Sequence, residues 1–211
     1  MNYFVTGTDT GVGKTYVTCL ILKALREAGK SVIGYKPVCC GDRGDAIALY
    51  EASDRDDLTI DDVNPLWLQS PAAPLAASMI ENREVDFESL VEHGRELAAK
   101  ADCLIVEGAG GWEVPLTGER SMADLAAAFG YDVIVAIDNK LGALNHTILT
   151  VKQIAARNMK CAGLILNQVA EERDAASISN RVVLEQVLDT PVIAELLHDA
   201  DEIEVSELNF G

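Results

Sequence analysis

One glycine-rich segment near the N-terminus restricts the fold of this chain more than any other feature. It reads Gly7-Thr-Asp-Thr-Gly-Val-Gly-Lys-Thr15, and it joins the apolar stretch Tyr3–Val5 to the apolar helical pattern Lys14–Ala28. Glycines let successive backbone N–H groups approach an anion, and a helix N-terminus adds unpaired donors and a partial positive charge. A strand, such a turn and a helix together predict the phosphate-binding loop of nucleoside triphosphatases.

The spacing within this loop is a variant of the general motif. Five residues separate Gly7 from Gly13, whereas the general motif has four. Lys14 is expected to reach the outer phosphates, and the Thr15 hydroxyl is expected to bind Mg²⁺. The alternative is a glycine-rich turn between a strand and a helix that binds no ligand.

Charge and composition restrict the class of partner. The 211 residues include 34 acidic and 17 basic side chains, which gives a net charge of −17. Such a surface repels nucleic acid and anionic membranes, so we expect a small-molecule partner. No apolar run approaches the roughly 20 residues that span a bilayer, and the expected N-terminal strand leaves no room for a signal peptide, so a cytoplasmic protein is expected. Five cysteines without a CxxC motif predict neither a disulfide framework nor a zinc site.

Apolar segments alternate with helical patterns along the whole chain. This alternation predicts an α/β protein: a single P-loop domain over residues 1–211, with a mostly parallel sheet covered by helices on both faces. The segment Ser53–Arg83, which contains three prolines, is expected to be a long irregular connection. The expected strands are Tyr3–Val5, Ser31–Tyr35, Cys103–Val106, Val133–Ile137, Ala162–Leu166 and Val192–Ala194, and the expected helices are Lys14–Ala28, Asp45–Glu51, Phe87–Lys100, Met122–Phe129, Ala143–Arg157 and Ser177–Leu188.

Polar residues follow several of these strands directly. Ligands bind at the carboxyl ends of parallel strands, so Lys36, Glu107 and Asn167 are expected at one rim with the phosphate loop. Lys36 could stabilise the charge that develops in phosphoryl transfer, and Asn167 could bind a purine edge. The alternatives are a solvated surface lysine and a turn residue.

Two carboxylates are candidates for a magnesium site. Mg²⁺ prefers oxygen ligands, so Thr15, Asp45 and Glu107 form a candidate set that waters and phosphate oxygens would complete. The alternatives are a helix N-cap for Asp45 and a helix-capping or loop-stabilising carboxylate for Glu107.

Several motifs taken together resemble the dethiobiotin synthetase family, nearly from end to end. Its usual form of the phosphate loop has the same five-residue spacing. The other motifs are Tyr35-Lys-Pro-Val38, Gly44-Asp-Ala46, Asn64-Pro65, Glu107-Gly-Ala-Gly-Gly-Trp112, and Lys140-Leu-Gly142 with Asn145-His146.

The resemblance implies an ATP- and Mg²⁺-dependent ring closure in biotin synthesis. A carbamate forms from CO₂ on one amine of 7,8-diaminononanoate, ATP phosphorylates it, and the second amine closes a cyclic urea. Lys14 and Lys36 would neutralise the transferred group. The implied nucleotide-binding residues are Gly11, Val12, Gly13, Lys14, Thr15, Tyr16, Asp45, Glu107, Gly108, Ala109 and Gly110, with Asn167 and Gln168 at the adenine.

The resemblance also implies a homodimer. The diamine would lie near Thr10, Lys36 and position 40, and its carboxylate would be held by the helix start Gly142, Ala143, Leu144 and Asn145 of a second subunit. A helix N-terminus suits a carboxylate. Two features depart from the family: Cys40 replaces the usual serine or threonine, and Leu196-Leu-His-Asp199 replaces a stretch with a proline and an aromatic residue.

Two other functions remain open at this stage. One is a related ATP-dependent ligase or amidotransferase that acts on another acid or amine. The other is a partition-type switch ATPase, although such proteins carry a signature lysine early in the loop where this chain has Asp9.

Overall fold

Six apolar segments assemble into one parallel sheet because most of their side chains are buried. The computed structural model describes residues 1–204, and the sheet has the strand order β2-β5-β1-β6-β7-β8. Every ladder in this sheet is parallel, as the sequence predicts, and β1 lies between β5 and β6. The strands are β1 (Tyr3–Gly7), β2 (Val32–Tyr35), β5 (Cys103–Gly111), β6 (Asp132–Asp138), β7 (Cys161–Asn167) and β8 (Val192–Leu196).

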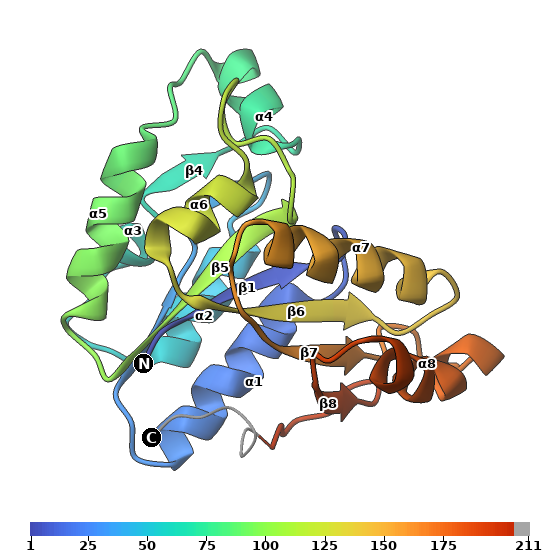
Figure 1. Ribbon diagram of the computed structural model, residues 1–211. Helices are drawn as coiled ribbons and strands as arrows, with labels where there is room; N and C mark the ends of the chain where they lie inside the picture. The colour runs from blue at the N-terminus through green and yellow to red at the C-terminus, as the bar shows by residue number, and fades with distance from the viewer. Residues whose placement is uncertain (205–211) are drawn as a thin grey trace.

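Helices cover both faces of this sheet, which confirms the predicted architecture. Leu22 of α1 and Leu49 of α2 close over Gly34 of β2. On the opposite face, the Tyr35 ring packs against Phe129 of α6 and against α5. Figure 1 shows α1 and α7 on opposite sides of the sheet. The helices are α1 (Lys14–Glu27), α2 (Gly44–Ser53), α3 (Ile60–Val63), α4 (Pro74–Glu81), α5 (Phe87–Ala98), α6 (Met122–Phe129), α7 (Ala143–Ala156) and α8 (Ala175–Val187).

The segment Ser53–Arg83 is not irregular, so that prediction was wrong. A capping box between Thr59 and Asp62 begins the short helix α3, and Pro74 occupies the first turn of α4. Between them, β4 (Leu66–Leu68) pairs in parallel with β3 (Val38–Cys40) to form a separate two-stranded sheet. Strands of three residues are too short to show a periodic pattern, which explains why the sequence does not reveal them.

Strand β5 is longer than the sequence predicts. It continues past Val106 to Gly111, so that Glu107 lies inside the strand, opposite Val5 of β1, rather than after its end. The glycines that follow Glu107 conceal the strand because glycine is uncommon in strand interiors. Since β1 itself ends at Gly7, Glu107 still lies close to the carboxyl rim of the sheet.

No helix within residues 1–204 is both long enough and apolar enough to cross a bilayer.

Candidate active site

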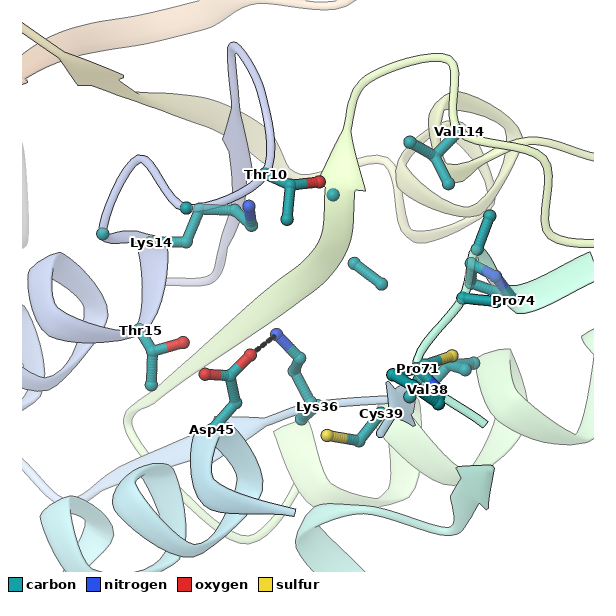
Figure 2. Close-up of a pocket in the computed structure, with 17 residues that line it drawn as sticks. Thr10, Lys14, Thr15, Lys36, Val38, Cys39, Asp45, Pro71, Pro74 and Val114 are labelled. Carbon is teal, nitrogen blue, oxygen red and sulfur yellow. Dashed lines mark hydrogen bonds and ion pairs between the residues drawn. The ribbon is translucent and has the colours of Figure 1, made fainter. Parts of the chain in front are cut away.

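A cavity of about 630 Å³ opens at the carboxyl rim of the large sheet. Volumes of this size are typical of sites for small ligands. Figure 2 shows Lys14 and Thr15 on one side of it, Pro74 and Val114 on the other, and Lys36 between them. The lining includes the predicted site residues Thr10, Gly11, Gly13, Lys14, Thr15, Lys36, Cys40, Asp45, Ala109 and Gly110.

Two glycines of the phosphate loop have left-handed backbone conformations. Gly11 and Gly13 have φ angles of 76° and 84°, which are strained for any residue with a side chain. A Cβ added at Gly13 would clash with Nδ2 of Asn167. That Nδ2 donates a hydrogen bond to the Val12 carbonyl oxygen at 3.0 Å. Asn167, the last residue of β7, therefore holds the phosphate loop through a side-chain hydrogen bond to its backbone.

Lys36 lies between two carboxylates at the base of the cavity. Its Nζ is 2.5 Å from Oε1 of Glu107 and 2.9 Å from Oδ2 of Asp45. The Thr15 hydroxyl donates to the same Glu107 oxygen at 2.8 Å. Because Lys36 and Glu107 are both buried, the alternative of a solvated surface lysine is excluded.

The electrostatics of this cluster follow from its geometry. Burial alone would lower the pKa of Lys36, but the facing carboxylates of Glu107 and Asp45 outweigh it, so the pKa lies above its ordinary value. Burial opposes ionisation of Asp45 as well, yet the Lys36 ammonium lowers the pKa of that carboxyl. Lys14 differs, because burial and the neighbouring Lys36 charge lower its pKa to about 8.

The oxygen atoms at this point fit a magnesium ion. Oε2 of Glu107 is buried and has no hydrogen-bond partner, although an orphaned carboxylate oxygen is costly unless a cation or donor meets it. The Thr15 hydroxyl and the half-exposed Asp45 carboxylate lie beside it. Hard oxygen ligands of this kind suit Mg²⁺ together with phosphate oxygens. No group of three or more His, Cys, Asp or Glu side chains within residues 1–204 could hold a metal by itself.

The far side of the cavity is apolar, and sequence reasoning missed it. It is formed by β3 and by the loop that leads into α4, together with Val114, which lies just after β5. The only available signal was the pair of prolines in a segment predicted to be irregular. The missed lining residues are Val38, Cys39, Pro71, Ala72, Ala73, Pro74 and Val114.

The remaining predicted residues lie outside this cavity. The hydroxyl of Tyr16 donates to the Ala200 carbonyl oxygen. The amide nitrogen of Gln168 donates to the carbonyl oxygens of Ala170 and Glu172, and its buried Oε1 has no partner. Residues 142–145 form the start of α7, where Gly142 is the N-cap; Gly142 and Asn145 are exposed, and Ala143 is buried. Their contacts with adenine and with the carboxylate stay predictions, as does a role for Val12 and Gly108.

Comparisons with known proteins extend over nearly the whole chain. The model of the AAA domain family matches residues 1–202. The ATP-dependent dethiobiotin synthetase BioD of Akkermansia muciniphila is 46% identical over 207 residues, which cover 98% of this chain and 97% of that protein.

Solved structures share the architecture at low sequence identity. A chain of the MinC:MinD cell division protein complex of Aquifex aeolicus has a TM-score of 0.59 at 17% identity, with 94% of this chain and 81% of that chain covered. A ParA family ATPase from Chlorobium tepidum has a TM-score of 0.58 at 17% identity, with 95% and 85% covered. Such likeness shows the P-loop fold alone, so it does not favour a switch ATPase.

Proposed function

The chain belongs to the AAA domain family and to the ATP-dependent dethiobiotin synthetases, and from this premise we propose that it closes the ureido ring of dethiobiotin. One amine of 7,8-diaminononanoate adds to CO₂ and releases a proton, which gives a carbamate. The carbamate oxygen attacks the γ-phosphorus of ATP and ADP leaves. The second amine then attacks the carbamoyl carbon and loses a proton, and the departure of inorganic phosphate gives the cyclic urea.

One observation carries this proposal: the phosphate loop and an apolar wall face each other across the same cavity. A triphosphate suits the side with Lys14 and Thr15. An aliphatic diamine suits the side with Pro71, Pro74 and Val114, where its methylene groups can leave water. The reacting carbamate and the γ-phosphate would then meet near Lys36.

The residues have separate roles in this scheme. Lys14 would bind the outer phosphates, and Lys36 would stabilise the charge on the transferred phosphoryl group. Thr15, Asp45 and Glu107 would hold Mg²⁺, which when bound neutralises the charge of the phosphate oxygens. Lys36 contacts both Asp45 and Glu107, so the proposed metal site would lie next to the position of the transferred phosphoryl group.

A second copy of the chain would complete the substrate site. Residues 142–145 lie outside the cavity of their own protomer, and their helix start could bind the substrate carboxylate of a partner. The exposed side chains of Leu141, just before α7, and of Leu149, in the middle of that helix, agree with burial in a homodimer. Sedimentation analysis of the purified protein would measure this state.

The test of the reaction is direct. The protein is incubated with 7,8-diaminononanoate, bicarbonate, Mg²⁺ and ATP, and mass spectrometry follows the cyclic urea while a coupled assay follows phosphate. We expect one phosphate for each cyclic urea and neither product without the diamine. Phosphate release without cyclic urea would instead favour a ligase with another substrate, or a switch ATPase.

The lowered pKa of Lys14 predicts proton uptake when ATP binds. Because the pKa of Lys14 is about 8, its side chain carries a positive charge below that pH and progressively loses the charge above it. Phosphates stabilise the charged form, so binding at about pH 8.5 should take up a large fraction of one proton and affinity should fall as pH rises further. Calorimetry in two buffers of different ionisation enthalpy measures the uptake.

Lys14→Arg is the matched variant for this measurement, because arginine stays charged throughout this range. The buffer-dependent heat near pH 8.5 should disappear in the variant. An equal proton uptake in both proteins would assign the titration to another group.

Cys40→Ser should preserve or improve affinity for the diamine. Burial raises the pKa of the Cys40 thiol to about 11, so it is a neutral and weak hydrogen-bond donor in the cavity wall. A hydroxyl there could contribute about 0.5–1.5 kcal/mol, or roughly a twofold to tenfold lower KM for the diamine. Steady-state kinetics measure this, with Cys161→Ser outside the cavity as the control. A large loss of activity would show that the thiol has its own role.

A further inference from the structure

Asn64 lies at the centre of a buried network that the proposed reaction does not yet use. Its side chain is fully buried, and each of its polar atoms has a partner. Nδ2 donates to the Lys36 carbonyl oxygen at 2.8 Å and to the Leu66 carbonyl oxygen at 3.1 Å. Oδ1 accepts a hydrogen bond from Nε of Arg43 at 2.9 Å.

The first branch of this network holds the backbone of Lys36. The N–H of Lys36 donates to the Val63 carbonyl oxygen at 2.8 Å, while its carbonyl oxygen accepts from Asn64. Both polar groups of the Lys36 peptide backbone are thus bonded to adjacent residues at the end of α3. The residue that follows is Pro37, which has no N–H to donate and restricts the backbone before it. The direction in which Lys36 leaves the sheet is therefore set by residues 63 and 64.

The second branch reaches the start of α2. Arg43 is the N-cap of α2, and its carbonyl oxygen accepts the first helical hydrogen bond, from Ile47. Asp45 lies in the first turn of that helix. The Arg43 guanidinium donates to both Oδ1 and the carbonyl oxygen of Asn64, and it stacks over the Trp67 ring at 5.4 Å. Asn64 thus connects the segment that carries Lys36 to the segment that carries Asp45.

We propose that Asn64, together with Arg43, is a positioning residue that sets the distance between Lys36 and Asp45. The two side chains meet at 2.9 Å although they come from different elements. A bidentate guanidinium and a side-chain amide with all of its donors used allow little movement. The proposal rests on the proposed function, because its purpose is to align the ammonium and carboxylate for phosphoryl transfer.

Asn64→Ala should lower kcat about tenfold to hundredfold, since a displacement of about 1 Å at a reacting group has effects of that size. The dissociation constant for ATP should change by less than about twofold, because the phosphate loop is held separately by Asn167. Arg43→Met, which keeps an apolar stem over Trp67, removes the second branch at a partly exposed site and should lower kcat in the same direction. Asp61→Asn is the control, because Asp61 is exposed, an amide oxygen in its place can still accept from Nη2 of Arg43, and both bonds between Arg43 and Asn64 remain.

A chemical readout separates positioning from a general loss of stability, and it does not depend on the reaction. Lys36 and Lys14 are both buried, and only Lys36 contacts Asn64. Acetylation with an N-hydroxysuccinimide ester, followed by peptide mass spectrometry, gives the ratio of Lys36 to Lys14 modification. We expect this ratio to rise severalfold in Asn64→Ala and Arg43→Met and to stay at the wild-type value in Asp61→Asn.

The outcomes distinguish the two proposals. If wild-type protein makes no cyclic urea, the proposed function fails, and the acetylation ratio still decides whether Asn64 positions Lys36. A wild-type kcat in Asn64→Ala, or an equal rise in modification of both lysines together with a lower melting temperature, would overturn the positioning role.

Discussion

Lys36→Ala is expected to lower kcat for cyclic urea formation by about a thousandfold, which corresponds to about 4 kcal/mol of transition-state stabilisation. The Lys36 ammonium lies at the base of the cavity, between Glu107 and Asp45, and among the described residues Lys14 is the only other cationic side chain in the lining. ATP affinity should change little, because the phosphate loop and Lys14 remain intact. Product formation measured at saturating substrates, with calorimetry for ATP binding, gives both quantities.

The control for this variant is Lys30→Ala, which removes an exposed lysine far from the cavity. Its kcat should equal that of the wild type. Full activity in Lys36→Ala would remove this side chain from the mechanism. A large loss of ATP affinity would instead assign it to ground-state binding.

Glu107→Gln is expected to raise the Mg²⁺ concentration for half-maximal activity by at least about tenfold, or about 1.4 kcal/mol. The amide has nearly the same shape as the carboxylate, so the packing is conserved while the negative charge is lost. Oε2 of Glu107 is the buried oxygen without a partner, and an amide nitrogen in its place would present hydrogens to the metal position. A Mg²⁺ titration of activity measures the change.

The control for the metal titration is Glu51→Gln, on the exposed side of α2. Its midpoint should match the wild-type value. An unchanged midpoint in Glu107→Gln would reject Glu107 as a ligand, and the orphaned oxygen would then need another explanation.

Local patterns were enough to predict the phosphate loop and the position of Lys36. The glycines, Lys14 and Thr15 act within a few residues of each other, and Lys36 directly follows a strand whose direction is evident from its apolar side chains. The architecture follows in the same way, because buried strands that alternate with helices have few other arrangements.

The sequence predicts that Lys36 and Glu107 share one rim of the sheet, but most of the individual contacts between distant residues were not predictable. Asn64 belongs to a recognisable motif, but its bond to Lys36 crosses 28 residues and depends on the short strands β3 and β4. Glu107 was assigned to the right rim although it lies within β5, since the glycines after it obscure the length of that strand. Pro71 and Pro74 suggested a loop, but nothing in the local sequence pattern indicated that this loop faces the phosphate loop across the cavity.

The two-stranded sheet of β3 and β4 has a consequence for how such a protein can change during evolution. The residues proposed to bind the triphosphate lie at the ends of strands of the large sheet, whereas much of the apolar surface opposite is formed by the small sheet and the loop after it. Mutations in the sheet of β3 and β4 can therefore alter which aliphatic substrate binds, while the phosphate-binding residues stay the same. A new substrate specificity could arise in this fold without any change in the residues proposed to bind ATP.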